Sequence, residues 1–121
     1  MTDKQLTGRR GEERAAELLE SLGYRIAARN YRHRRTEIDL IAWDGDILVF
    51  VEVKTRKNCD FGHPSALISP AQQRRISHAA GVYMEEIDYD WEIRFDVVSV
   101  VLEGRQAGIE HLPDAFFPGL F

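Results

Sequence analysis

The stretch EIDLIAWDGDILVFVEVK, residues 37–54, constrains the fold of this chain more than any other segment. Two runs rich in branched and aromatic residues flank Asp-Gly, which is the strongest short signal for a β-hairpin. We therefore expect antiparallel strands at 37–43 and 47–54. Ionisable side chains interrupt these runs where a covered sheet would carry valine or isoleucine. They are Glu37, Asp39, Glu52 and Lys54.

The position of the hairpin loop decides how these charged residues meet, because side chains alternate between the two faces of a strand. If a two-residue loop begins at Asp44, Glu37 lies opposite Glu52. If it begins at Gly45, Asp39 lies opposite Glu52. Either register predicts all four charged residues on one face, whereas a three-residue loop would separate them. Opposed residues have Cβ atoms about 4.5–5.5 Å apart, so two carboxylates could converge on one ion.

Helical periodicity and end signals predict two helices outside the hairpin. Thr7 is expected to cap a first helix that ends near Gly23, and Glu12 lies on its apolar face. Gly8 and Gly11 are expected to let this helix approach the sheet. A second helix is expected to begin with a serine cap followed by proline in the sequence SPAQQRR. Further strands are expected at 24–32 and 92–104, with a short one at 106–112.

This order of elements, α-β-β-β-α-β, predicts an α/β fold with a mixed central sheet flanked by helices. The length suits a single domain over residues 1–121. Its core is expected at about 8–102, followed by a C-terminal extension at 103–121. The segment PDAFFPGLF in this extension carries large apolar residues and is expected to dock on the body or on a partner.

Charge is distributed unevenly along the chain, although the whole chain has a formal net charge of −4. Residues 1–84 carry 14 Lys/Arg against 11 Asp/Glu, whereas residues 85–121 carry 2 against 9. A basic side can still attract a phosphate backbone. The single Cys59 and the polar N-terminal segment favour a reducing, cytoplasmic setting. No apolar run approaches the ~20 residues of a membrane span.

The charged hairpin has two interpretations. Acids and lysines on a half-solvated strand are ordinary, and Glu-x-Lys is common by chance. However, buried carboxylates without a partner are costly, and one lysine does not balance three acids. Mg²⁺ binds one or two carboxylates together with other oxygens. Asp39, Glu52 and the backbone carbonyl of Val53 would supply such ligands, and Lys54 would stabilise charge on a phosphoryl group.

The spacing of Asp39, then 12 residues, then Glu52-Val53-Lys54 resembles the PD-(D/E)xK nuclease superfamily. In its archaeal Holliday-junction-resolvase-like branch an acid on the preceding helix completes the site, and Glu12 matches it. The chain also resembles the YraN-like family of uncharacterised small bacterial proteins over about residues 8 to 100. The matching segments are GRRGEERAAELLESLGYRIAARNYR, EIDLIAWDGDILVFVEVKTR, SPAQQRRISHAAGVYM and RFDVVSV.

This resemblance implies a restriction-endonuclease-like core and a metal-dependent endonuclease that hydrolyses phosphodiesters of DNA, including branched DNA. It implies Mg or Mn held by Asp39 and Glu52, with Glu12 as a further acid and Lys54 as the catalytic lysine. Resolvases of this fold act as dimers, so a homodimer is expected. The sequence departs from the family at Thr36 and Gln72, where glycine and lysine are usual.

Contacts with nucleic acid are expected around the basic segment RNYRHRR and on the second helix. The expected residues are Arg29, Tyr31, Arg32, Arg34, Arg35, Arg56, Gln72 and Arg74. A solvated loop would equally explain the arginines, and Gln72 alternatively completes a helix-capping box. The histidines lack zinc spacing and are expected on the surface or in loops. Asp96 is expected to be a hydrogen-bonded strand acid.

A second function remains open from the sequence. The same fold without catalysis would serve as a nucleic-acid-binding or protein-interaction module. The intact set of Glu12, Asp39, Glu52 and Lys54 favours an enzyme, whereas the acidic C-terminal third and its apolar end favour a protein partner.

Overall fold

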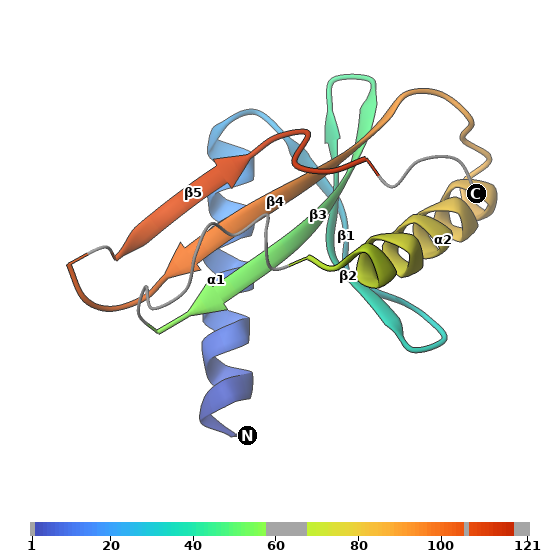
Figure 1. The fold of residues 1–121 in the computed structure, drawn as a ribbon. Helices are drawn as coiled ribbons and strands as arrows, with labels where there is room; N and C mark the ends of the chain where they lie inside the picture. Colours follow the sequence, from blue (N-terminus) through green and yellow to red (C-terminus); the bar gives the residue numbers. More distant parts are fainter. Residues whose placement is uncertain (1, 58–67, 106, 118–121) are drawn as a thin grey trace.

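A computed structural model describes residues 2–57, 68–105 and 107–117 of the chain (Figure 1). The expected order of elements is confirmed within these ranges, including the short last strand. The elements are α1 (Asp3–Ser21), β1 (Arg25–His33), β2 (Thr36–Asp44), β3 (Ile47–Arg56), α2 (Pro70–Glu86), β4 (Ile93–Val101) and β5 (Gly108–Leu112).

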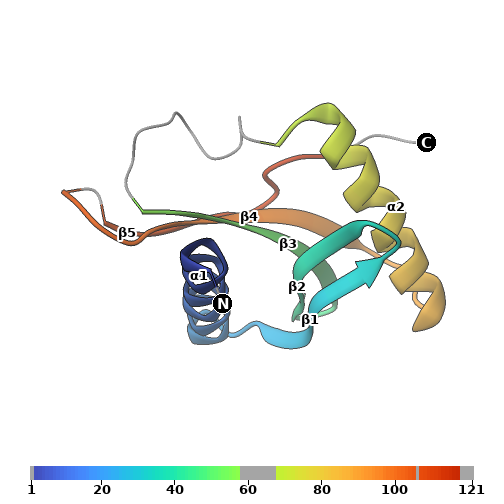
Figure 2. The same ribbon diagram turned by 90° about the horizontal axis from the view of Figure 1, so that it is seen from below.

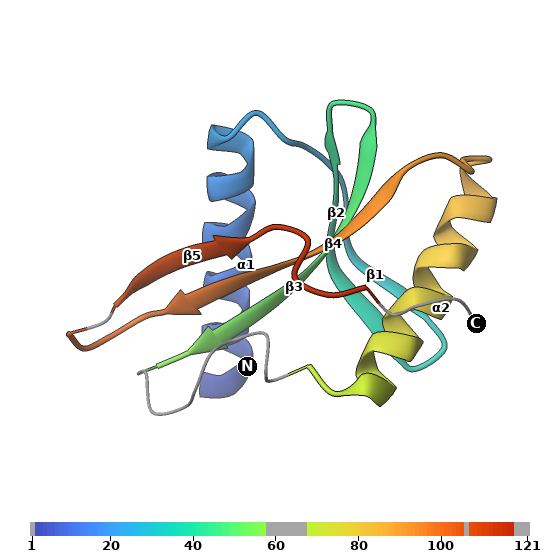
Figure 3. The same cartoon turned by 45° about the horizontal axis from the view of Figure 1, so that its top comes forward.

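The strands form one mixed sheet in the order β1-β2-β3-β4-β5. Among the described strands only β3 and β4 pair in parallel, and α2 lies in the connection between them, as a parallel pair requires. The two helices cover opposite faces of this sheet, which Figure 2 shows nearly edge-on. α1 packs mainly on β3 and α2 on β2 (Figure 3). The architecture is an α/β fold compatible with a restriction-endonuclease-like core.

Each face of the sheet has its own apolar layer. Under α1 the layer contains Ala15, Ala16, Leu19, Leu40, Val49, Val51, Val53, Val98 and Val100. Under α2 it contains Ile38, Ile41, Leu48, Phe50, Ile76, Ala79, Ala80 and Phe95. Because both faces of β3 and β4 are covered, their central residues are apolar in succession rather than alternately.

The first helix begins earlier than the sequence predicted. Thr2, not Thr7, is the N-cap, and it forms a capping box with Gln5. The Thr-x-x-Gln pattern at these positions carries this signal. The end of the helix is as expected, because Gly23 follows it with φ of 93°. The earlier start extends the N-terminal part of α1 beside the acidic residues described below.

Gly11 lets α1 approach the sheet closely. A Cβ atom built at Gly11 would lie 1.8 Å from Thr55 Oγ1 and 2.7 Å from Thr55 Cβ. The expectation for Gly11 is therefore confirmed. Gly8 has no atom within 4 Å of such a Cβ, so the same expectation is wrong for Gly8. The close approach at Thr55 brings the adjacent residue, Glu12, near β3.

The β2–β3 hairpin adopts the register that places Asp39 opposite Glu52. Leu40 pairs with Val51 and Asp44 pairs with Ile47, which leaves a two-residue loop beginning at Gly45. Gly45 has φ of 60°, the left-handed conformation that a type II′ turn requires at its first loop residue.

The expectation that all four charged residues share one face is wrong, because the alternation of β2 is interrupted. Ile38 and Ile41 both lie in the layer under α2, although residues three positions apart face opposite sides of a regular strand. On β1 their partners Tyr31 and Ala28 show the same shift. Asn30 lies between these partners with φ of 51°. This local change of twist turns Glu37 toward α1.

A buried ionic network anchors the last strand. Asp96 on β4 is fully buried and accepts hydrogen bonds from Arg94, from His111 on β5 and from the backbone of Asp114. The expectation for Asp96 is confirmed. The expectation for His111 is wrong, because its ring is half-buried in a strand and lies edge-on to Tyr24.

The described part of the C-terminal segment docks on the body. Ala115 donates a backbone hydrogen bond to Phe95, and Phe116 stacks on Phe95 with 5.2 Å between ring centroids. Cys59 and residues 118–121 lie outside the described residues. In the part of the chain that is described, no helix has the length and apolar character needed to cross a membrane.

Candidate metal centre

Three acids gather where α1 meets the interrupted part of β2. One carboxylate oxygen each of Glu12, Glu37 and Asp39 lies within 4.8 Å of the others. All three side chains are half-buried. Glu12 reaches this place because it shares the inward face of α1 with buried Ala15 and Ala16. The three oxygens are hard ligands of the kind that Mg²⁺ and Mn²⁺ take.

Asp39 connects this acidic cluster to β3. Its Oδ2 accepts a 2.7 Å hydrogen bond from the backbone N–H of Val53. The backbone pairing of β2 with β3 ends at Leu40 and Val51. Beyond this pair, the backbone N–H of Val53 is bound by the Asp39 side chain and not by a backbone carbonyl of β2. Asp39 also interacts directly with the Glu52 carboxyl. Asp39 thus stands between Glu52 on one side and Glu12 with Glu37 on the other.

The acids raise one another's affinity for protons. Burial, followed by the charge of Glu52, raises the pKa of Asp39 to about 8. Burial also raises the pKa of Glu52, although the nearby Lys54 opposes this shift. Burial raises the pKa of Glu12 against the opposing hydrogen bond from Asn30. Excess negative charge in a half-buried place is relieved by a proton or by a cation.

Asn30 is a site residue that the sequence reasoning missed. Its side-chain nitrogen donates 2.7 Å hydrogen bonds to Glu12 Oε1 and to Glu37 Oε1. The left-handed backbone at Asn30 places the amide there. The sequence did carry a sign of this site, namely an asparagine inside a predicted strand. Asparagine is rare in strands and tolerates positive φ, so it indicates a local break in the strand.

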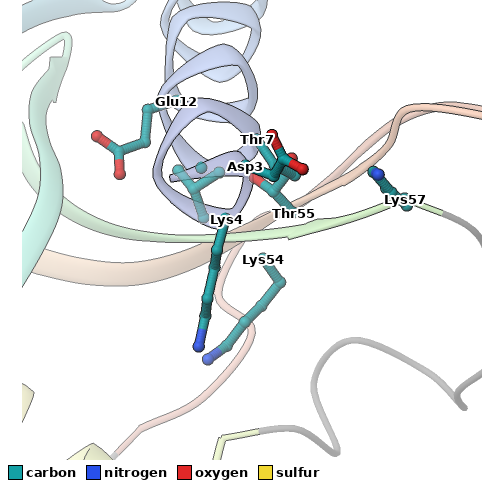
Figure 4. A pocket seen from close by; sticks show the side chains of 9 residues that line it. Asp3, Lys4, Thr7, Glu12, Lys54, Thr55 and Lys57 are labelled. Carbon is teal, nitrogen blue, oxygen red and sulfur yellow. The ribbon is translucent and has the colours of Figure 1, made fainter. Parts of the chain in front are cut away.

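Lys54 lies beside the acids and opens onto a groove. Its Nζ is 3.9 Å from Glu52 Oε1, and 23% of its side chain is exposed. A groove of about 490 Å³ runs between the start of α1 and the end of β3, with Glu12 and Lys54 among its lining residues. Figure 4 shows Lys4 and Lys54 extending in the same direction from α1 and β3. Lys57 adds a third ammonium group to this groove.

A second groove meets the first at Glu12. It has a volume of about 600 Å³ and is lined by Arg9, Arg32, Asn30 and Glu37 as well as Glu12. Arg32 forms a 2.8 Å ion pair with Glu37. The acidic cluster therefore has cationic side chains on both sides, three lysines toward the end of β3 and two arginines toward β1.

Gln72 contacts the site rather than completing a capping box. Ser69 accepts a hydrogen bond from the Gln72 backbone, as a helix cap does. The Gln72 side chain instead lies 3.4 Å from Glu52 Oε2, within hydrogen-bonding distance. Glu52 is therefore reached from α2 on one face, while Asp39 connects it to the acids near α1.

The other residues expected to contact nucleic acid are spread over several surfaces. Arg32 lies beside the acidic cluster, whereas Arg34, Arg35 and Arg74 line a different groove near α2. Arg29 is exposed and Arg56 is half-buried on β3. Tyr31 packs edge-on against Tyr83 and donates to Glu86, so its ring belongs to the packing under α2. Burial and Glu86 raise the pKa of Tyr31 to about 12.

The fold and this acidic pocket define a small α/β protein with a candidate divalent-cation centre. A family model described as "Uncharacterised protein family UPF0102" matches residues 11–100. The chain belongs to this family, which confirms the resemblance to the YraN-like proteins. The family's description assigns no activity.

Curated relatives from several bacteria match nearly the whole chain. A UPF0102 protein of Chlorobium limicola is 44% identical, with 95% of each chain covered. One of Prosthecochloris aestuarii is 46% identical, with 91% of this chain and 92% of the relative covered. One of Christiangramia forsetii is 38% identical, with 97% and 98% covered.

Proposed function

We propose that this protein is a metal-dependent nuclease that hydrolyses phosphodiester bonds of DNA with Mg²⁺ or Mn²⁺. One observation carries the proposal. Asp39 is half-buried among the carboxylates of Glu12, Glu37 and Glu52, and its pKa is raised to about 8 by burial and by Glu52. Such a cluster is costly in a folded protein unless a ligand offsets it, and a divalent cation is the ligand that fits its oxygens.

The ligand set of this proposal is centred on Asp39. The sequence suggested Asp39, Glu52 and the Val53 carbonyl, with Glu12 nearby. The observed cluster adds Glu37 to the candidates, because its carboxylate lies within 4.8 Å of those of Glu12 and Asp39. When bound, the cation would supply positive charge for the phosphate and lower the pKa of water.

The chain's own residues account for the rest of the reaction. Lys54 places an ammonium group at the groove, where it would stabilise negative charge developing on the phosphoryl oxygens. Glu12 would accept the proton of the attacking water, because burial already raises its pKa. The new bond joins the water oxygen to phosphorus, and the ester bond to the leaving oxygen breaks. The leaving oxygen takes its proton from solvent.

DNA is the proposed substrate because cations border the acids on two sides. The grooves that meet at Glu12 carry Lys4, Lys54 and Lys57 on one side and Arg9 with Arg32 on the other. A strand could place one phosphate at the acids and its neighbours on these cations. Branched DNA and a homodimer remain parts of the proposal that follow from the resemblance to resolvases.

A cleavage assay tests this proposal. Fluorescent junction, flap, single-stranded and duplex DNA are incubated with the purified protein in Mn²⁺. We expect cleavage of at least one substrate, and a fall of more than about 100-fold in Asp39→Ala and Lys54→Ala because each loses charge stabilisation. Absence of cleavage in the wild type, or wild-type rates in either variant, would contradict it.

A non-catalytic module is the second candidate function. It is favoured by the exposed Phe117 side chain, 70% accessible, next to the acidic C-terminal third. In that case the protein would bind a partner or nucleic acid but would bind no divalent cation. Binding of Mn²⁺ at the acidic cluster therefore separates the two functions.

A further inference from the structure

A cationic groove lies away from the acidic pocket, between the tip of the β1–β2 hairpin and the first half of α2. Its volume is about 550 Å³. The hairpin wall consists of His33, Arg34, Arg35 and Thr36, and the α2 wall of Ala71, Arg74, Arg75 and His78. Figures 1 and 3 show the hairpin tip beside the beginning of α2. We call this surface the hairpin groove.

The charged side chains that line the hairpin groove are cationic on both walls. The groove carries four arginines, and no carboxylate lines it among the described residues. All four arginine side chains belong to exposed residues. Like charges gathered in one concavity repel each other, so an anionic ligand would stabilise them. Guanidinium groups suit phosphate in particular, because they donate two parallel hydrogen bonds to its oxygens.

The histidines add an independent sign of a ligand. Nε2 of His33 is buried, and no hydrogen-bond partner is found for it within the described part of the chain. A buried polar atom without a partner costs roughly 1–3 kcal/mol. The His33 ring lies 5.4 Å from that of His78, which is exposed on α2. The unpartnered nitrogen therefore belongs to a residue of the groove lining, next to an accessible ring.

The hairpin groove is a different surface from the acidic pocket but borders it. Arg32 lines the groove at Glu12, and the next residue, His33, lines the hairpin groove. Successive residues of a strand face opposite sides of the sheet. β1 is the edge strand, so the two grooves lie on opposite faces of the sheet beside the same edge.

We propose that the hairpin groove binds the phosphodiester backbone of nucleic acid independently of metal, as a second contact beyond the acidic pocket. Nucleic acid is favoured over an acidic protein segment by the arginines on both walls and by the short distance along β1 to the groove at Glu12, whose lining includes Arg32. This inference goes beyond the proposed function, since it requires neither cleavage nor a bound cation.

The test is equilibrium binding of fluorescent duplex and single-stranded DNA in EDTA, followed by anisotropy at several salt concentrations. The variant Arg35→Ala/Arg75→Ala removes one cation from each wall. The matched control, Arg14→Ala/Arg105→Ala, removes two exposed arginines that line none of the three grooves described above. Both variants are first checked for wild-type thermal unfolding.

We expect the groove variant to bind at least about tenfold more weakly than the control and to reduce the slope of log K against log salt by about 1.4 to 1.8. Equal affinity of the two variants would overturn the inference. So would competition by poly-glutamate at the same charge concentration as effectively as by unlabelled DNA, because the groove would then be a site for acidic protein. The assay follows binding in EDTA and requires no cleavage, so a failure of the proposed catalysis is distinguishable from a failure of this site.

Discussion

At the scale of single residues, Asp39 explains why the hairpin carries charges inside its apolar runs. Its carboxylate accepts a hydrogen bond from the backbone N–H of Val53, in place of a backbone hydrogen bond between β2 and β3. The same side chain lies close to the carboxylates of Glu12, Glu37 and Glu52. The interruption of the ladder is not visible in the spacing of the sequence, whereas helical periodicity did place Glu12 on the inward face of the first helix. The alternation of strand residues indicated that either Glu37 or Asp39 would lie opposite Glu52.

The raised pKa of Asp39 predicts how stability depends on pH without metal. Between about pH 4 and pH 8 the folded state binds more protons at this residue than the unfolded state, so the free energy of unfolding falls as pH rises. Asp39→Asn removes this ionisation. We expect the variant to exceed the wild type by more than about 1 kcal/mol at pH 8 in EDTA, with a smaller gain at pH 5.

Urea denaturation at these two pH values measures this effect. Asp90→Asn is the control, because Asp90 is exposed. The same gain at both pH values, or an equal gain in the control, would contradict the prediction.

Gly11 and Gly8 form a matched pair on α1. Gly11→Ala would force a Cβ into Thr55, so we expect a loss of about 1–3 kcal/mol in the free energy of unfolding. Gly8→Ala meets no atom within 4 Å and replaces a helical glycine, so we expect a gain of about 0.5–1 kcal/mol. Urea denaturation of both variants checks the pair. Equal effects would show that Gly11 is not required for close approach.

At the scale of elements, most of the fold was predictable and the acidic cluster was only partly so. Apolar runs, the Asp-Gly turn and the Ser-Pro helix start predict their elements because each signal acts locally. Register parity left two pairings open, with either Glu37 or Asp39 opposite Glu52, and it assumed a regular strand; the structure has the second pairing. The change of twist at Asn30 depends on one backbone angle and moves Glu37 to the other face.

Asn30 is therefore the residue that tests this element. Valine disfavours positive φ and removes the bridging amide, whereas glycine removes the amide but accepts the backbone. We expect Asn30→Val to be less stable than Asn30→Gly by about 1–3 kcal/mol. Thermal or urea unfolding measures the difference. A glycine variant as unstable as the valine variant would show that the side-chain bonds, not the backbone, dominate.

At the scale of the whole molecule, two clusters of ionisable residues differ in their role. One, around Asp96, holds the structure together, and the other, around Asp39, is the candidate functional site. The Asp96 network ties β4, β5 and the C-terminal segment together, whereas the Asp39 cluster opens onto grooves. Burial alone would raise the pKa of Asp96, but hydrogen bonds from His111, Arg94 and the Asp114 backbone outweigh it and hold this pKa below its usual value. The acid whose charge is balanced by hydrogen bonds, Asp96, thus has a structural role. The acids whose charges repel one another, around Asp39, mark the candidate functional site.

The Asp96 network predicts a large effect on stability. Asp96→Ala leaves Arg94 without its buried partner, so we expect a loss of about 3–5 kcal/mol in the free energy of unfolding. Asp90→Ala is the exposed control and should change stability by less than about 0.5 kcal/mol. Denaturation at neutral pH measures both. A loss below about 1 kcal/mol for Asp96→Ala would contradict the structural role of the network.

Calorimetric titration with Mn²⁺ tests most directly whether the acids around Asp39 form a metal centre. The wild type, Asp39→Asn and the exposed control Asp90→Asn are compared at pH 8, near the raised pKa of Asp39, where a substantial fraction of this carboxyl is ionised. We predict micromolar binding in the wild type and the control, weakened more than about tenfold in Asp39→Asn. No binding by the wild type, or equal binding by Asp39→Asn, would contradict the account.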